Sequence, residues 1–133
     1  MSIVENKSSY HLLGTPQELI EYVAAWQQEP VIAIDTEFMR TNTYFAKPGL
    51  IQVADSKGVY LIDPLLVTDL RPLSGLLENP KVTKIMHSMG EDVELLYYTT
   101  GARIENIFDT QIAAAFLGYG ASLGYQSLVS EVL

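Results

Sequence analysis

The chain has 133 residues, of which 48% are apolar and 18% are charged, a composition that fits one folded domain and excludes disordered, collagen-like and coiled-coil chains. Cysteine is absent, so disulfide frameworks, thiolate zinc sites and cysteine nucleophiles are excluded, and a reducing, cytoplasmic location is expected. The net charge of −8 disfavours nucleic-acid binding by counterion release alone, although carboxylates that hold cations can still receive a phosphate.

The first half of the chain predicts a helix followed by three strands. Residues 15–18 have the pattern of a capping box, with proline at the first helical position, and apolar residues then recur at helical spacing over about 16–27. The apolar run 31–34 predicts a buried central strand that leads into the acidic segment 35–37. Two apolar runs within 50–62 flank a polar turn, so we expect a hairpin beside that strand.

In the second half, helices and strands are expected to alternate. The expected elements are a short helix at about 70–78, a strand at 82–86, a helix from a second capping box at 88–91 through 98, a strand at 104–108, a helix at 111–117 with Asp109 as N-cap, and a last helix from 122. The order predicts a mixed sheet covered by helices. No apolar stretch suggests a membrane span or a secretory leader.

Asp35 and Glu37 are the first candidate functional residues. They are two residues apart on one predicted strand, so their side chains project from the same face with Cα atoms roughly 7 Å apart. Two carboxylates at the end of a buried strand repel each other unless cations or basic groups neutralise them, and oxygen ligands favour magnesium or manganese. The plainer alternative is a strand end that turns into solvent.

Asp92 adds a third acid in the first turn of the helix that follows the strand at 82–86. If that strand pairs in parallel with the strand at 31–34, Asp92 lies at the same sheet edge as Asp35 and Glu37. The three acids could then share a cation site. The alternative for Asp92 is stabilisation of the helix dipole, and Glu91 is best explained by the capping box.

Five segments of the chain share a family pattern. They are Asp35-Thr36-Glu37-Phe38-Met39-Arg40-Thr41 with Tyr44, Gly49-Leu50-Ile51-Gln52, Ile62-Asp63-Pro64-Leu65, Lys84-Ile85-Met86-His87 with Glu91-Asp92, and Phe108-Asp109-Thr110-Gln111. Together they resemble the ribonuclease D family, which belongs to the DEDD superfamily of 3′-5′ exonucleases. The resemblance implies an α/β, ribonuclease H-like mixed sheet of three antiparallel and then parallel strands, with helices on both faces.

The resemblance also implies a site and a reaction. Asp35 and Glu37 match the first exonuclease motif and Asp92 the second, so the three are expected to be catalytic and to hold two divalent metal ions, Mg²⁺ or Mn²⁺. The expected substrate is RNA with a single-stranded 3′ end, such as a tRNA precursor, from which 5′-mononucleotides are released. The residues assigned to the terminal nucleotide are Thr36, Phe38, Met39 and His87. A structural, hydrogen-bonded role is the plainer interpretation of His87, and core packing is the alternative for Phe38.

Three lone basic residues, Arg40, Lys47 and Lys84, are further candidates for phosphate contacts, although such residues are more often simply solvated.

The third motif of the family, Tyr-x-x-x-Asp, is absent, because no tyrosine in the sequence is followed four residues later by aspartate. We therefore expect residues 1–133 to be a single, partial exonuclease domain that lacks its C-terminal helices and its fourth metal-binding acid. Such a fragment is expected to be inactive and to self-associate through an uncovered apolar patch.

Two other functions were weighed. An aspartyl phosphatase usually reads Asp-x-Asp, where this chain has Glu37. A non-catalytic nucleic-acid-binding or structural domain with a decayed site stays open.

Overall fold

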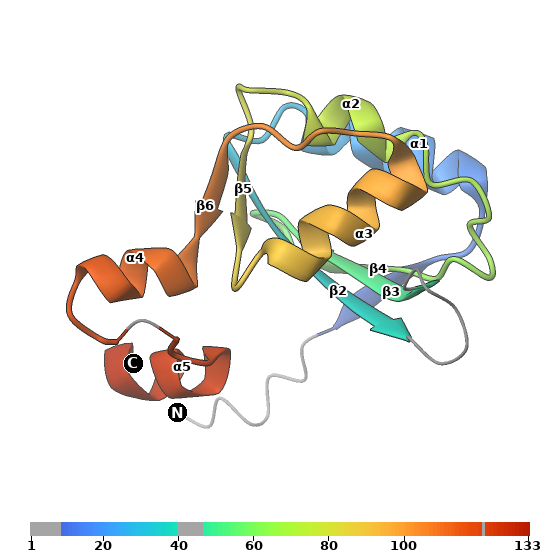
Figure 1. Cartoon of the computed structure of the whole chain (residues 1–133). Helices are drawn as coiled ribbons and strands as arrows, with labels where there is room; N and C mark the ends of the chain where they lie inside the picture. The colour runs from blue at the N-terminus through green and yellow to red at the C-terminus, as the bar shows by residue number, and fades with distance from the viewer. Residues whose placement is uncertain (1–8, 40–46, 121) are drawn as a thin grey trace.

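The computed structural model describes residues 9–39, 47–120 and 122–133. Six strands form one sheet in the order β1-β4-β3-β2-β5-β6 (Figure 1). The strands are β1 Tyr10–Leu13, β2 Val31–Met39, β3 Lys47–Ala54, β4 Val59–Ile62, β5 Thr83–Met86 and β6 Ile107–Asp109, and the helices of the described residues are α1 Pro16–Trp26, α2 Leu73–Leu77, α3 Gly90–Thr100, α4 Thr110–Phe116 and α5 Tyr125–Val132.

The sheet is mixed, as the sequence predicts. β2, β3 and β4 are successive antiparallel neighbours, while β5 pairs in parallel with β2 and β6 in parallel with β5. The sheet also contains a strand that the sequence pattern does not predict, because Tyr10–Leu13 form β1 in parallel with β4. Only Leu13 of this strand is buried, so the strand has little of the apolar pattern by which strands are found in a sequence.

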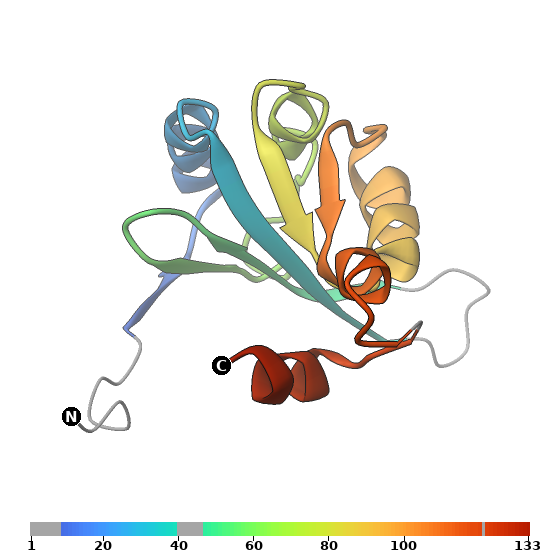
Figure 2. The same cartoon turned by 90° about the vertical axis from the view of Figure 1, so that its left-hand side faces the viewer.

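Helices α1, α2 and α3 cover one face of the sheet (Figure 2). Alternation along β2 explains which of its residues face these helices. Ile32, Ile34 and Thr36 point to the helical side and are buried, whereas Asp35 and Glu37 point to the other side and are exposed. The buried cluster on the helical side contains Trp26, Ile51, Leu76 and Leu96 among others.

The opposite face of the sheet is largely uncovered in the described residues. Leu12 is 45% exposed and Val31 is 41% exposed on this face. In the described residues α5 lies near this face, where Tyr125 and Thr110, the first residue of α4, line a cavity together with strand residues (Figure 2). Helices therefore lie on both sides, as expected, but the two sides are covered very unequally.

Two helix starts follow different rules. The hydroxyl of Thr15 accepts a hydrogen bond from the Glu18 backbone N–H at 3.2 Å, so the predicted cap of α1 is confirmed. The capping box predicted at Ser88 is wrong: Ser88 has φ of 54° and α3 receives no side-chain cap from its own N-cap residue, Met89. A left-handed backbone at Ser88 turns the chain away from the geometry that a capping box requires.

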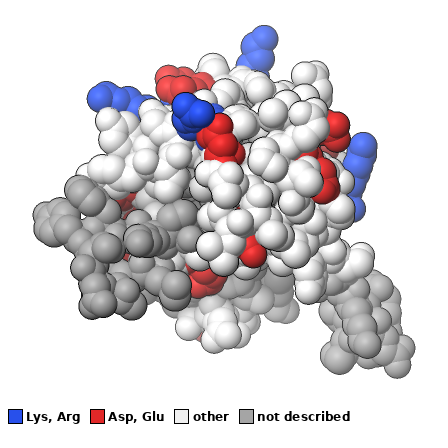
Figure 3. All heavy atoms as spheres, turned by 90° about the vertical axis from the view of Figure 1, so that its right-hand side faces the viewer, with Lys and Arg blue, Asp and Glu red and all other residues white. Residues whose placement is uncertain are grey.

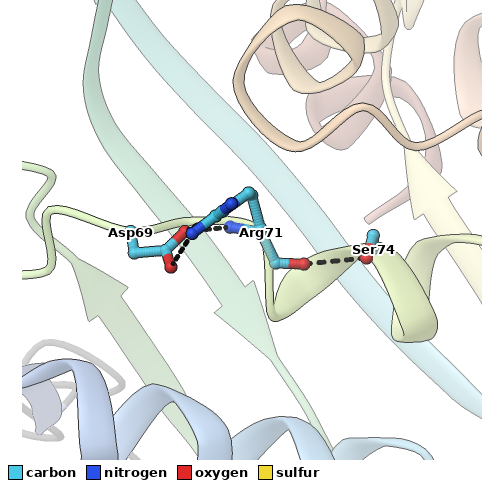
Figure 4. A network of polar contacts seen from close by, with 3 residues as sticks. All are labelled: Asp69, Arg71 and Ser74. Atoms are coloured by element: carbon cyan, nitrogen blue, oxygen red, sulfur yellow. Dashed lines mark hydrogen bonds and ion pairs between the residues drawn. The ribbon is translucent and has the colours of Figure 1, made fainter.

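The approach to α2 is held by an ion pair on the surface (Figure 4). Arg71 donates from Nε and Nη2 to the two carboxylate oxygens of Asp69, each at 2.9 Å. These hydrogen bonds lower the pKa of Asp69 to about 2. Ser74 then donates from its hydroxyl to the Arg71 carbonyl at 2.8 Å, which ties the pair to the first turn of α2.

On the face shown in Figure 3, the basic side chains of the described residues are interspersed with acidic ones. Among the described residues, every helix is too short or too polar to cross a membrane.

Candidate active site

The acidic pair lies on β2, on the face away from α1–α3. Asp35 is paired with Gln52 of β3 and Glu37 with Leu50, and both acidic residues are exposed. The register between the strands shifts between Glu37 and Phe38. Opposite this irregularity, a Cβ on Gly49 would come within 3.3 Å of the Glu37 carbonyl, so the close approach of β3 to Glu37 favours a residue without a side chain.

Asp92 reaches β2 from the other side. It is 7% exposed in the first turn of α3, and its Oδ1 accepts a hydrogen bond from the hydroxyl of Thr36, which is 5% exposed. Because Thr36 alternates with Asp35 and Glu37 along the strand, this contact lies on the helical side of the sheet. Thr36 therefore contacts a candidate catalytic acid.

The pKa of the Asp92 carboxyl is raised above its ordinary value of 3.8, chiefly because the group is buried. Repulsion from Asp35 and Glu91 raises it further, whereas the hydrogen bonds from Thr36 act to lower it. Asp35 directly precedes Thr36, the residue whose hydroxyl contacts Asp92. A cation between them would relieve both the burial and the repulsion.

The donor set of Asp35, Glu37 and Asp92 consists of carboxylate oxygens, which fits Mg²⁺ or Mn²⁺ better than zinc. Within residues 9–39, 47–120 and 122–133, however, no three or more histidine, aspartate and glutamate side chains are grouped closely enough to hold a metal ion. The structure thus brings Asp92 to β2 beside the acidic pair, and the joining of all three around a cation stays a prediction.

A cavity of about 470 Å³ opens beside Asp35. It lies where β2 and β5, paired only as far as Ala33 and Ile85, separate toward their carboxyl ends. Its lining includes Asp35, Gln52, His87, Thr110 and Tyr125. Gln52 and Thr110 stand within the segments that show the family pattern, but nothing in the sequence around Tyr125 indicated that its ring would face the sheet.

His87 has the structural role that its alternative interpretation predicts. Its Nε2 donates to the Leu123 carbonyl at 3.0 Å, and its Nδ1 shares a hydrogen bond of 2.8 Å with the Thr110 hydroxyl. The ring also meets Tyr125 edge-on, with centroids 5.7 Å apart. Nε2 thus holds the segment before α5 and Nδ1 holds the first residue of α4, and His87 forms part of the cavity wall.

The structure describes only part of the other residues that were assigned to the substrate. Phe38 is half-buried directly after Glu37. The backbone of Met39 pairs with that of Lys47 at the end of β2, while the side chains of both, and the whole of Arg40, Thr41 and Tyr44, lie outside the described residues.

The interpretation of Lys84 as a phosphate contact is wrong. This side chain is fully buried, and its Nζ donates to the carbonyls of Asn79 at 2.6 Å and Glu105 at 3.1 Å. Burial lowers the pKa of Lys84, and the charge of Glu105 partly opposes that effect. Lys84 joins two loops beneath β5 and does not face a ligand.

Comparisons with known proteins agree with this geometry. A family model described as 3′-5′ exonuclease matches residues 10–133. Ribonuclease D of Pseudomonas paraeruginosa is 47% identical over 115 residues, which cover 86% of this chain and 31% of the relative. Ribonuclease D of Escherichia coli is 42% identical over 123 residues, covering 92% of this chain and 33% of the relative. The chain thus spans about a third of the length of these curated relatives.

Solved structures give the same result. The crystal structure of Escherichia coli RNase D, described as an exoribonuclease involved in structured RNA processing, superposes with a TM-score of 0.87 at 41% identity, covering 92% of this chain and 33% of that one. Trypanosoma brucei RNase D in complex with RNA U12 gives a TM-score of 0.70 at 27% identity, covering 80% and 39%. The chain therefore belongs to the 3′-5′ exonuclease family and is a homologue of ribonuclease D.

Proposed function

We propose that this chain is the core of a metal-dependent 3′-5′ exoribonuclease, which hydrolyses phosphodiester bonds at single-stranded RNA 3′ ends and releases 5′-mononucleotides. One observation carries the proposal: β2 bears an exposed acidic pair of which Asp35 lines a cavity, and a buried third acid contacts the same strand, in a chain matched by a 3′-5′ exonuclease model over residues 10–133. We infer RNA as the substrate because the relatives described above act on or bind RNA. The reaction that we infer is trimming of the kind that processes tRNA 3′ ends.

Each acid has a distinct part in this proposal. Asp35, Glu37 and Asp92 would hold two divalent metal ions, which when bound supply an activated water and neutralise charge on the phosphodiester. Asp35 neighbours both other acids and is the least replaceable of the three. Thr36 orients the carboxylate of Asp92 through its hydroxyl.

The cavity is suited to receive the terminal nucleotide. Tyr125 offers an aromatic face on which a base can stack with little regard to its identity. Gln52 offers an amide that can bind a ribose or a base. The family resemblance further assigns Thr36, Phe38 and Met39 to the terminal nucleotide, and His87 is part of the cavity wall.

We further propose that residues 1–133 are one partial exonuclease domain with little activity alone. The sequence contains no Tyr-x-x-x-Asp, the motif that in the family supplies the fourth acid and a tyrosine that orients the attacking water. Each lost donor of this kind commonly costs roughly 10²-fold to 10³-fold in rate. The same observation favours the second candidate, a domain that binds nucleic acid or supports a structure without catalysis.

The proposal is tested first by titration of the protein with Mn²⁺ in a calorimeter. Wild type is expected to bind, and Asp35→Asn to bind at least tenfold more weakly. Asp55→Asn is the matched control, because Asp55 accepts backbone hydrogen bonds from Lys57 and Gly58 in the hairpin turn between β3 and β4. Equal binding by wild type and Asp35→Asn would refute the site.

A second experiment separates the two candidate functions. A 3′-labelled single-stranded RNA is incubated in Mg²⁺ with residues 1–133 and with a longer form of the protein that contains a Tyr-x-x-x-Asp motif. Release of mononucleotides by the longer form alone supports the proposal. Equal trimming by the short form would show that the third motif is unnecessary, and binding without trimming by either form would favour the non-catalytic alternative.

A further inference from the structure

Asp109 stands between two helix starts. It ends β6, is 8% exposed, and its carboxylate accepts hydrogen bonds from the backbone N–H groups of four residues. Two of these belong to α4, which Asp109 caps: Gln111 at 2.8 Å and Ile112 at 3.4 Å. The other two belong to the turn between β5 and α3: Ser88 at 3.0 Å and Met89 at 2.8 Å.

The ionisation of Asp109 is consistent with these contacts. Burial would raise the pKa of this carboxyl, but the hydrogen bonds from Met89, Ser88, Gln111 and Ile112 outweigh the burial and lower it. The group is therefore a carboxylate under ordinary conditions, and hydrogen bonds to an ionised acceptor are about twice as strong as neutral ones.

The start of α3 depends on this outside contact. Ser88 has φ of 54°, a strained conformation for a residue with a side chain. The N-cap residue, Met89, provides no side-chain hydrogen bond to the helix. The first helical hydrogen bond runs from Val93 N–H to the Met89 carbonyl at 2.8 Å, so the residue that Asp109 holds is also the residue on which the first turn of α3 is built.

Asp92 lies in that first turn. We propose that Asp109 is a positioning residue for the active site: by holding Ser88 and Met89 it fixes the start of α3, and so the place of the Asp92 carboxylate against Thr36. This inference rests on the proposed function, in which Asp92 is a ligand of the catalytic cation. Asp109 itself touches neither Asp92 nor, in this proposal, the metal or the RNA.

A simple helix cap is the competing explanation, and one substitution separates the two roles. Serine caps helices about as well as aspartate, so Asp109→Ser keeps an acceptor for Gln111 and Ile112. Its shorter side chain has one oxygen and cannot reach Ser88 and Met89 as well. Asp55→Ser is the matched control, because Asp55 also accepts two backbone hydrogen bonds but lies in the turn between β3 and β4, which β2 and β5 separate from β6.

The test measures Mn²⁺ affinity by calorimetry and amide hydrogen exchange by NMR on the same samples. For Asp109→Ser we expect Mn²⁺ affinity to fall roughly 10-fold to 100-fold, the usual effect of losing a group that orients a metal ligand. We also expect exchange at Val93 to accelerate at least tenfold while exchange at Gln111 and Ile112 changes little. Asp55→Ser should leave both readouts within about twofold of wild type, because any loss of stability there is remote from α3.

The outcomes distinguish this inference from the proposed function. If wild type binds Mn²⁺ and Asp109→Ser binds it equally well, positioning by Asp109 is refuted and Asp109 is only the cap of α4. If wild type binds no Mn²⁺, the proposed metal site fails, and exchange alone decides the inference: unchanged exchange at Val93 refutes control of the α3 start, and accelerated exchange there supports it.

Discussion

The hydrogen bond from Thr36 to Asp92 predicts a stability effect that depends on pH. Thr36→Val removes the hydroxyl while keeping the shape of the side chain, and it leaves a buried carboxylate without its donor. A hydrogen bond to a charged group contributes about 1.5–3 kcal/mol, and a neutral one about 0.5–1.5 kcal/mol. For a chain of this size, 1 kcal/mol corresponds to roughly 4 °C in Tm, so a decrease of about 6–12 °C is expected at pH 7.

The pH dependence follows from the direction of the pKa shift. The folded pKa of Asp92 is raised above 3.8, so its carboxyl is mostly neutral at pH 3.5 and gains its charge as the pH rises through the folded pKa. The cost of Thr36→Val is therefore expected to shrink to about 1 kcal/mol at pH 3.5, where the lost bond is a neutral one.

The assay is urea unfolding at pH 7 and pH 3.5, with Thr100→Val as control. Thr100 is also buried, but it donates to the Leu96 carbonyl and accepts from the Ala102 N–H, and neither partner titrates. Thr100→Val should lower the free energy of unfolding by the same amount at both pH values. The reasoning is refuted if Thr36→Val also lowers the free energy of unfolding equally at both pH values. It is also refuted if the loss at pH 7 is the same in an Asp92→Asn background.

Three further results are expected. Asp92→Asn should raise Tm at pH 7. The raised folded pKa means that ionisation of Asp92 disfavours folding, and this penalty begins only as the pH rises above the ordinary value of 3.8, so the substitution should have no such effect below that pH. A lower Tm of Asp92→Asn at pH 7 would contradict this. Lys84→Ala should lower the free energy of unfolding by roughly 3 kcal/mol in urea titrations, because it opens a cavity at a fully buried side chain and removes two partly buried charged hydrogen bonds. Lys81→Ala at an exposed position should change it by less than about 0.5 kcal/mol. Light scattering of residues 1–133 should show a mass that rises with concentration, because the face that carries the exposed Leu12 and Val31 is largely uncovered by the part of the chain that the structure describes; a constant monomer mass would argue against self-association.

The features predicted correctly from the sequence are those encoded locally. β2 and the β3–β4 hairpin follow from continuous apolar runs around a polar turn, and the start of α1 follows from Thr15, Pro16 and Glu18. In each case the residues that determine the structure are close together in the chain. The acidic pair on β2 needed only the alternation of a strand.

The features that were missed depend on partners far apart in the sequence. The cap of α3 was assigned to Ser88, but the acceptor comes from Asp109, across the turn from a different strand. Lys84 looked like a surface cation because its two carbonyl partners belong to separate loops. The bond between Thr36 and Asp92 links β2 to α3, and no periodicity within either element predicts it.

The strand order has a consequence for how the protein folds during synthesis. Of the six described strands, β1 leaves the ribosome first, but its partner in the sheet is β4, so β1 and α1 emerge before the strand edge against which β1 pairs exists. β2, β3 and β4 must first form their antiparallel ladder, and only then can β1 dock in parallel on its far side. Parallel pairing over such a sequence separation is slow because the intervening chain must be ordered first. The amino-terminal strand is therefore expected to join the sheet late, and a chaperone that binds nascent chains would meet it while its backbone is still unpaired.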